Sequence, residues 1–235
     1  MAAQRFLEIK DLHAWYGESH VLHGVNLHVD EGEVVTLLGR NGAGRTSTLR
    51  AILGLVGSRK GSIKVRGQEA IAMATHRIAR LGLGYCPEER GIFSSLSAEE
   101  NLMLPPTLGA NGMSVEQIYA MFPNLKERAS SQGTRLSGGE QQMLAVAWIL
   151  RTGARLLLLD EISEGLAPVI VQKLAEMVLA LRRQGYTIVM VEQNFRFAAP
   201  LADRFLVMEH GQVIQQFTQA ELPARMERLH EYLGV

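Results

Sequence analysis

The stretch Glu33-Val-Val-Thr-Leu-Leu-Gly39-Arg-Asn-Gly-Ala-Gly44-Arg45-Thr46-Ser47 decides the fold of this chain. An unbroken apolar run, typical of a buried strand, leads into a glycine-rich turn, and we expect an apolar helix over residues 48–56. The spacing is that of a phosphate-binding loop, Gly-x4-Gly-Lys-Ser/Thr, with Arg45 at the lysine position. Glycines allow backbone N–H groups to surround an anion, and the positive end of the next helix points at it. The sequence therefore predicts a nucleotide site.

The whole loop is expected to contact the phosphates of ATP, and the Thr46 hydroxyl is expected to bind Mg²⁺. Its residues are Gly39, Arg40, Asn41, Gly42, Ala43, Gly44, Arg45, Thr46 and Ser47. Arginine keeps the charge of lysine but is longer, planar and forked, so the exchange at Arg45 is not conservative. Because the charge on the transferring phosphoryl group grows during reaction, we expect Arg45 to lower turnover more than nucleotide affinity.

A second apolar run, Arg155-Leu-Leu-Leu-Leu-Asp160-Glu161, ends in two acids. Carboxylates at the end of a buried strand are costly unless they bind a cation or act on water. In phosphate-loop proteins such an aspartate holds Mg²⁺, so Asp160 is predicted as a metal residue. Glu161 is predicted as the general base that polarises the attacking water. The alternative for this segment alone is a solvated acidic turn after a strand.

Composition excludes several classes of function. The chain has 235 residues, of which 47% are apolar and 20% charged, and its 24 basic and 24 acidic residues balance. Without a net basic field, nucleic acid is not an expected partner. The single cysteine, Cys86, excludes an intrachain disulfide and fits a reducing compartment. The first residues have no apolar core of a signal peptide, and the apolar run at 143–150 is far short of the roughly 20 residues that span a bilayer.

Strand-like and helical stretches alternate along the chain, which indicates an α/β fold. Residues 25–29 alternate apolar and polar side chains as an antiparallel strand does, and 156–159 and 186–191 are continuous apolar runs of central strands. Residues 97–150 are mostly helical in pattern, with capping boxes at Ser97 and Ser114 and breaks at 105–106 and 109–112. We expect one domain over 1–235, with an α/β core at about 1–87 and 152–235 and an inserted helical subdomain at about 88–151.

A third motif names a family. Leu136, Ser137, Gly138, Gly139 and Glu140, followed by Gln141-Gln142, precede a predicted helix whose start can bind an anion. With the two motifs above, this pentapeptide makes the chain resemble the ATP-binding subunits of ABC transporters over nearly its whole length. Within them it is most similar to the second ATPase of branched-chain amino-acid importers, a subgroup that also includes importers of urea or other amides. The closer match rests on the phosphate loop, this pentapeptide, Ser163-Glu-Gly-Leu-Ala-Pro168 and Val191-Glu-Gln-Asn194.

The resemblance implies further roles and a fold. The fold would be a RecA-like mixed sheet with an antiparallel β subdomain, plus the helical insertion. Tyr16 would stack on adenine, with a core tyrosine as the alternative, and Glu88 would lie near Mg²⁺ and the membrane partner. Gln193 stands where most members have a histidine that contacts the γ-phosphate, and Ile162 stands where proline is usual. An amide can bond a phosphate oxygen or water but carries no charge.

The resemblance also implies partners. Two ATPase subunits, identical or different, would face head to tail, and ATP would lie between the phosphate loop of one and residues 136–140 of the other. The pair would drive transmembrane permease subunits, and indirectly a solute-binding protein, from the cytoplasmic side of the inner membrane. Closure by ATP and release by hydrolysis would be a ligand-driven population shift.

Three alternatives remain open from the sequence. Arg45 could make the chain a degenerate partner that binds ATP with weak or no hydrolysis. A non-transport ABC ATPase, such as a repair or translation factor, usually has long inserts or two ATPase domains. The third alternative is a phosphate-loop kinase, but a kinase would give residues 136–140 no role. Residues 221–235 are predicted to form an amphipathic helix that packs on its own domain.

Overall fold

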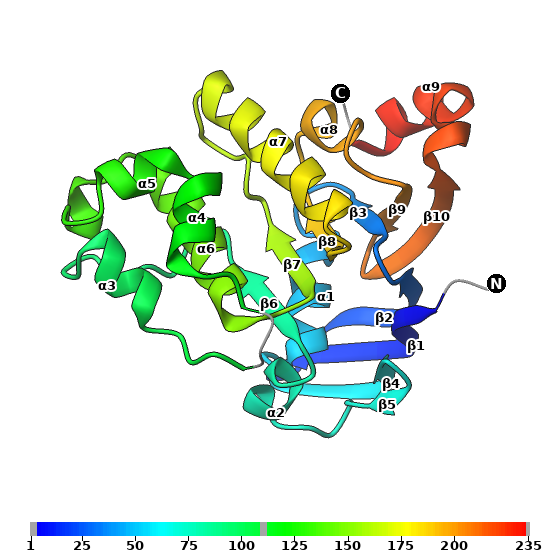
Figure 1. The fold of residues 1–235 in the computed structure, drawn as a ribbon. Coiled ribbons are helices and arrows are strands. Elements are labelled where there is room, and N and C mark those ends of the chain that lie inside the picture. Colours follow the sequence, from blue (N-terminus) through cyan, green and yellow to red (C-terminus); the bar gives the residue numbers. More distant parts are fainter. Residues whose placement is uncertain (1–3, 109–111, 234–235) are drawn as a thin grey trace.

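A computed structural model describes residues 4–108 and 112–233, which form two β-sheets and a set of covering helices (Figure 1). The first sheet is antiparallel, with strand order β2-β1-β4-β5. Its strands are β1 (Arg5–Tyr16), β2 (Ser19–Asp30), β4 (Ser58–Val65) and β5 (Gln68–Glu69). This sheet confirms the predicted antiparallel subdomain, and β2 contains the predicted strand at 25–29.

The second sheet has the order β10-β9-β3-β8-β7-β6. Its strands are β3 (Val34–Leu38), β6 (Leu83–Cys86), β7 (Leu156–Asp160), β8 (Thr187–Val191), β9 (Arg204–Glu209) and β10 (Gln212–Thr218). All pairs are parallel except β9 with β10, so the sheet is mixed, as expected. Every residue of β3, β7 and β8 is buried, which explains their continuous apolar sequences. Because parallel strands share one carboxyl edge, the segments that follow β3, β7 and β8 meet there.

Helices cover both faces of the second sheet. On one side α1 (Arg45–Leu53) packs among the strands of both sheets through Leu49 and Ile52. On the other side lie α6 (Gly138–Thr152) and α7 (Pro168–Arg183). Two short helices, α2 (Thr75–Ala79) and α8 (Phe195–Ala198), complete this core. The sequence-based helix at 48–56 was placed too late, because the turn ends at Gly44 and the helix already begins at Arg45.

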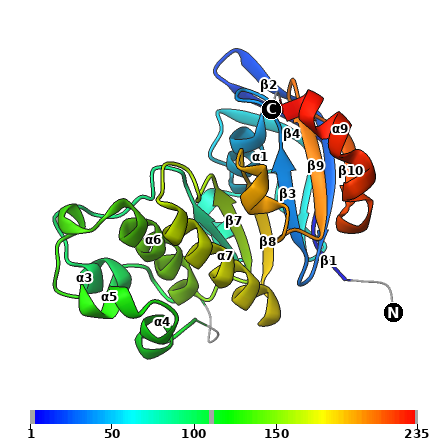
Figure 2. The same cartoon turned by 90° about the horizontal axis from the view of Figure 1, so that it is seen from above.

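Between β6 and β7 the chain forms a helical lobe that lies at the opposite end of the molecule from β10 and the C-terminal helix (Figure 2). It contains α3 (Ala98–Met103), α4 (Val115–Met121), α5 (Pro123–Glu127) and the long helix α6. Both predicted capping boxes are present, at Ser97 and Ser114. Part of the predicted glycine break, residues 109–111, lies outside the described residues, and the proposed subdomain boundaries stay a prediction.

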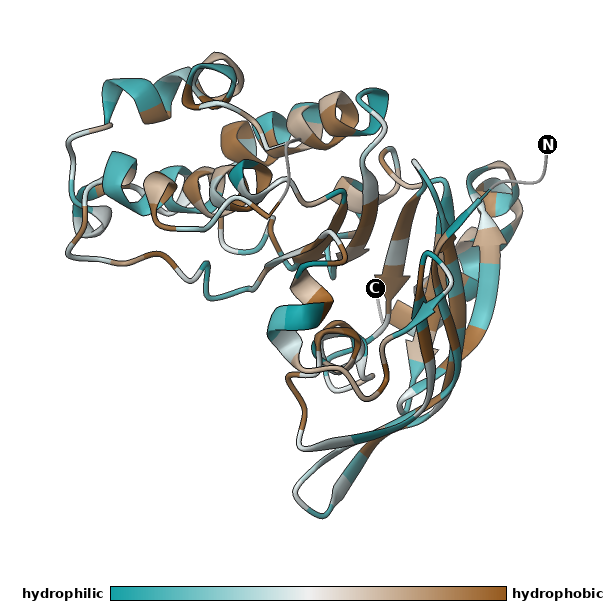
Figure 3. Cartoon of the chain, turned by 60° about the horizontal axis from the view of Figure 1, so that its bottom comes forward, coloured by the Kyte–Doolittle hydropathy of each residue, from teal (hydrophilic) through white to brown (hydrophobic). Residues whose placement is uncertain are grey.

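The last helix, α9 (Leu222–Leu233), follows the short 3₁₀ turn Gln219–Glu221. Leu229 is buried against the core, and Leu222, Tyr232 and Leu233 pack beside it, as the amphipathic pattern predicts. Figure 3 shows the central strands as apolar along their length, whereas the helices carry polar and apolar faces. Within the described parts of the chain, we find no helix with the length and apolar character that crossing a membrane requires.

Candidate nucleotide-binding and hydrolysis site

A cleft of about 630 Å³ opens at the carboxyl edge of the six-stranded sheet. It brings together residues 41–47 of the glycine-rich loop with Glu88, Glu161 and Gln193, which the sequence separates by up to 152 positions. Gly39 and Arg40 do not line this cleft; Arg40 borders a smaller hollow between the loop and Tyr232 of α9. Most of the predicted phosphate site is therefore assembled by the fold.

Two glycines of the loop are required by its geometry. Gly39 has φ 153°, and a Cβ there would approach the carbonyl oxygen of Met208 to 2.4 Å. Gly44 has φ 102°, and a Cβ there would lie 3.0 Å from Leu22 and 3.1 Å from Gly211. Both positions combine a backbone conformation that favours glycine with tight contact to neighbouring segments. The loop thus keeps the close turn that places residues 41–47, with the start of α1, along the cleft.

Arg45, the first residue of α1, is only 5% exposed. One guanidinium nitrogen, Nη2, donates to Glu161 Oε1 at 2.9 Å and to Asn41 Oδ1 at 3.2 Å. The other terminal nitrogen, Nη1, is buried and has no hydrogen-bond partner among the described residues. An unsatisfied buried donor is costly, so the Arg45 guanidinium, which lines the cleft, has hydrogen-bonding capacity left for an anion.

Asp160, at the end of β7, is fully buried behind the loop. Its Oδ1 accepts a hydrogen bond from the Thr46 hydroxyl at 2.9 Å, and its Oδ2 accepts one from the Tyr85 hydroxyl at 3.0 Å. Burial raises the pKa of Asp160, which the bonds from Thr46 and Tyr85 partly offset. Sequence reasoning paired Thr46 with Asp160 but missed Tyr85, because a tyrosine within an apolar strand gives no signal of a polar role.

A hydroxyl beside a carboxylate fits Mg²⁺, which prefers oxygen ligands and keeps waters and phosphate oxygens in its shell. Within residues 4–108 and 112–233, no group of three or more His, Cys, Asp or Glu side chains is arranged to hold a metal alone. Thr46 and Asp160 therefore fit a metal that arrives with a nucleotide. Glu88 lines the same cleft, and burial followed by repulsion from Glu161 raises its pKa.

Glu161 has φ 49°, and its N–H donates to the carbonyl of Val191 in β8 at 2.8 Å. This turn directs its carboxylate into the cleft, where Gln193 Nε2 donates to Oε2 at 3.1 Å and to Asn41 Oδ1 at 2.6 Å. Burial raises the pKa of Glu161, Glu164 adds to the rise, and Arg45 opposes it. The cleft thus holds a carboxylate with raised proton affinity next to an amide that can orient a neighbouring molecule.

The β1–β2 hairpin contributes side chains that the sequence did not single out. His20 and His23 of β2 line the cleft, and Trp15 stacks on His20 with ring centroids 4.3 Å apart. Tyr16, the predicted adenine residue, ends β1, is 37% exposed and is not among the residues that line the cleft. Histidines in an exposed hairpin carry no motif, so only the fold reveals their position.

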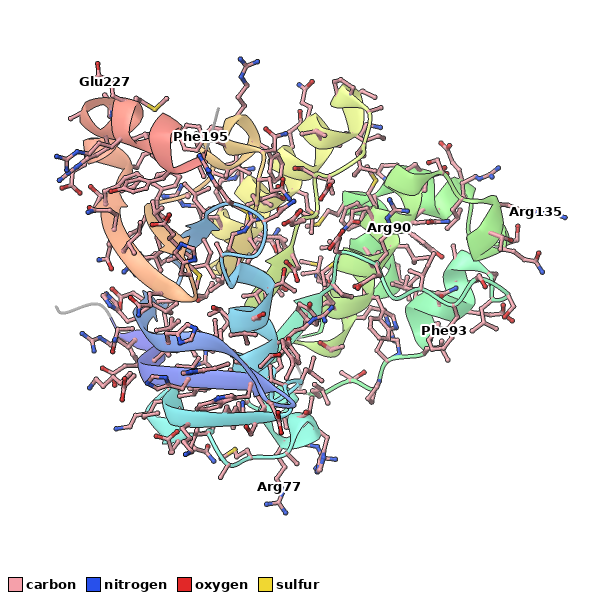
Figure 4. All side chains as sticks on the ribbon, turned by 180° about the vertical axis from the view of Figure 1, so that it is seen from behind. Arg77, Arg90, Phe93, Arg135, Phe195 and Glu227 are labelled. Carbon is pink, nitrogen blue, oxygen red and sulfur yellow. The ribbon has the colours of Figure 1, made fainter. Side chains whose placement is uncertain are left out.

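Residues 136–140 lie at the start of α6 in the helical lobe and do not line the cleft. Ser137 is the N-cap: its Oγ accepts from the N–H of Glu140 at 3.3 Å, and Glu140 Oε2 accepts from the N–H of Ser137 at 2.7 Å. Arg90 Nη1 donates to Gln141 Oε1 at 2.8 Å and so ties the segment after Glu88 to this helix. Figure 4 shows Arg90 beside the helices of the lobe and Phe93 toward their outer edge.

Comparison with known proteins agrees with this geometry. The family described as "ABC transporter" matches residues 22–164. The high-affinity branched-chain amino acid transport ATP-binding protein BraG of Pseudomonas aeruginosa is 38% identical, over 97% of this chain and 99% of that protein. The lipopolysaccharide export system ATP-binding protein LptB of Escherichia coli K12 is 31% identical, over 97% of each chain.

Among solved structures, a nucleotide-free ATP-binding cassette from an ABC transporter superposes with a TM-score of 0.85 at 19% identity. The match covers 98% of this chain and 99% of that one and shows the shared fold. The motifs, the assembled cleft and these relatives lead to one assignment: the chain belongs to the ABC transporter family and is an ATP-binding protein of that family.

Proposed function

We propose that this chain binds ATP with Mg²⁺ in the cleft and hydrolyses it to drive substrate import through a membrane permease. The observation that carries the proposal is the buried Arg45 guanidinium at the head of the loop. Its Nη2 bonds Glu161, and its Nη1 has no hydrogen-bond partner among residues 4–108 and 112–233. A guanidinium that bonds a carboxylate through Nη2 and still has the N–H groups of Nη1 to donate can bind a second anion.

Binding rests on the loop and α1. Backbone N–H groups of residues 41–46 and the positive end of α1 favour the β- and γ-phosphates. Arg45 Nη1 supplies a charged donor to the γ-phosphate. Thr46 and Asp160 hold Mg²⁺, which neutralises charge on the two terminal phosphates when bound. Tyr16 lies on the hairpin that contributes His20 and His23 to the cleft, so it reaches adenine from the rim.

Hydrolysis rests on Glu161 and Gln193. Glu161 takes a proton from water, whose oxygen bonds to the γ-phosphorus as the bond to the bridging oxygen breaks, leaving ADP and phosphate. Gln193 donates to the same carboxylate and positions the water. For Glu161 to act, Arg45 Nη2 transfers its hydrogen bond from Glu161 to a phosphate oxygen, so nucleotide entry also frees the base.

The partner surfaces lie on the helical lobe. Residues 136–140 lie outside their own cleft, which supports a role at the ATP of a second subunit in a head-to-tail pair, identical or different. The Ser137 hydroxyl hydrogen is not used in the N-cap and can donate to a phosphate oxygen of that ATP. Phe93, which follows Glu88 by five positions, and Met103 and Leu104 at the end of α3 are large exposed apolar residues, and we assign the permease contact to them.

For the cargo we propose branched-chain amino acids or related small polar solutes, delivered to the permease by a solute-binding protein. The support is the 38% identity to BraG across almost the whole of both chains. On this proposal the chain works at the cytoplasmic side of the inner membrane. Uptake of labelled leucine and of labelled urea by cells with and without this subunit tests the cargo. Unchanged uptake of both solutes without the subunit would contradict the proposed cargo.

A second candidate is a partner that binds ATP but turns it over weakly, favoured by the ion pair between Arg45 and the proposed base. Phosphate release from ATP by the purified chain, with Mg²⁺ and with chelator, separates the two. We expect release that requires Mg²⁺. ATP binding without release, in the chain alone and with its permease, would support the second candidate.

A further inference from the structure

Glu192 occupies the position between the end of β8 and Gln193, and its side chain is 1% exposed. Its two carboxylate oxygens are both taken by one residue. The hydroxyl of Ser163 donates to Oε2 at 2.7 Å, and the N–H of Ser163 donates to Oε1 at 3.2 Å. Glu192 therefore joins the segment after β8 to the turn after β7 by two hydrogen bonds.

A carboxylate is a costly choice at this position. In the described part of the chain no Lys, Arg or His side chain forms an ion pair with Glu192. Burial, followed by repulsion from Glu161, raises its pKa to about 7, although the bonds from Ser163 and the charge of Arg45 oppose the rise. A glutamine could make two hydrogen bonds of similar geometry without a charge, so packing alone does not explain the acid. Perturbed acids of this kind gather at functional sites.

What Glu192 holds is the turn that carries Glu161. At one end of the turn, the Glu161 N–H donates to Val191 of β8; two residues later, Ser163 is held by Glu192. Glu161 has a left-handed backbone conformation, which persists only where its surroundings enforce it. The next residue of the β8 segment, Gln193, bonds the Glu161 carboxylate itself. The turn is thus fastened to one strand end at three successive residues.

We infer that Glu192 is a positioning residue for ATP hydrolysis: by holding Ser163 it fixes the turn that aims Glu161 into the cleft. The inference rests on the proposed role of Glu161 as the base. Glu192 does not line the phosphate cleft and acts only through the turn. Hydrogen bonds to an ionised acceptor are roughly twice as strong as neutral ones, so the charged form holds the turn more tightly.

The test compares kcat and KM for ATP in wild type, Glu192→Gln and Glu192→Ala. The matched control is Glu176→Gln, which removes an exposed carboxylate on α7. We expect kcat to fall about three- to tenfold in Glu192→Gln and further in Glu192→Ala, with KM within about twofold in both. In wild type kcat should rise with pH through about 7, and Glu192→Gln should lose that component. A Glu192→Gln enzyme with the kcat and pH profile of the control would overturn the inference.

Hydrogen exchange of the peptide over residues 161–167 gives a readout that needs no hydrolysis. Loss of the Glu192 carboxylate in Glu192→Ala should speed exchange there. In a separate kinetic test, adding Ser163→Ala to Glu192→Gln should lower kcat little further, because both changes remove the same bridge. Unchanged exchange in Glu192→Ala would show that Glu192 does not hold the turn. If wild type hydrolyses no ATP while exchange responds as expected, the proposed hydrolysis is wrong and the bridge itself stands.

Discussion

Arg45 Nη2 donates a 2.9 Å hydrogen bond to Glu161 Oε1, with the two side chains only 4% and 9% exposed. The residue in the lysine position of the phosphate loop is therefore joined directly to the proposed base, 116 positions later in the chain. A buried ion pair of this kind stabilises both charges, and breaking it costs several kcal/mol unless another partner replaces one of them. A bound γ-phosphate is such a partner.

The first prediction concerns this pair. Arg45→Lys should raise kcat for ATP about two- to tenfold and change KM little, because a single ammonium holds Glu161 less firmly and acts as a compact charge on the phosphates. Steady-state phosphate release measures both constants. Arg45→Ala serves as the control and should lose ATP binding. Equal or lower kcat in Arg45→Lys would show that the arginine fork is adapted to this site.

Removing metal-binding groups should change the Mg²⁺ requirement. Thr46→Ala and Asp160→Asn should each raise the Mg²⁺ concentration for half-maximal hydrolysis by about tenfold, because each removes an oxygen from the proposed metal site. Tyr85→Phe removes only the hydroxyl that bonds Asp160 and should have a smaller effect. A Mg²⁺ titration at saturating ATP measures this, and an unchanged midpoint in both Thr46→Ala and Asp160→Asn would place the metal elsewhere.

Local sequence predicted the parts of this site but not all of their connections. The central strands, the glycine turn and the helix that follows residues 136–140 are predicted by neighbouring residues, because strand burial and helix starts are set over a few positions. The contact between Arg45 and Glu161, the bond from Tyr85 to Asp160 and the bridge from Glu192 to Ser163 join separate strand ends. No local pattern encodes these, because they depend on strand order and on the direction in which each turn leaves the sheet.

The pH dependence of the free energy of unfolding should reveal the raised pKa of Glu192. Its pKa is about 7 in the folded chain, against 4.5 for a glutamate exposed to water, so over that range the unfolded chain loses the proton first. The folded state then binds more protons, and the free energy of unfolding falls as pH rises from about 4.5 to about 7, by at most about 3 kcal/mol.

The Glu192→Gln side chain does not titrate, so this change in stability with pH is absent from the variant. Its unfolding free energy relative to wild type should therefore increase across this range, even as its kcat falls. Urea denaturation of both proteins at pH 5, 6, 7 and 8 gives the difference. A difference that stays constant with pH would mean that Glu192 titrates normally in the folded chain.

The loop geometry makes a stability prediction. Gly39→Ala should destabilise the chain by about 2 kcal/mol or more, because its Cβ would meet the Met208 carbonyl at 2.4 Å. Gly32→Ala is the matched control: it also has positive φ, 77°, but nothing lies within 4 Å of its Cβ, so it should cost only about 1 kcal/mol of strain. Thermal denaturation compares them, and equal losses would show that the close contact relaxes freely.

The most direct test is phosphate release from ATP by wild type beside Glu161→Gln, with ATP binding measured on the same samples. If Glu161 is the base, the variant should bind ATP at least as well as wild type while its kcat falls about 10²- to 10⁴-fold. Turnover that survives in Glu161→Gln at the wild-type rate would contradict the assignment of Glu161 as the base.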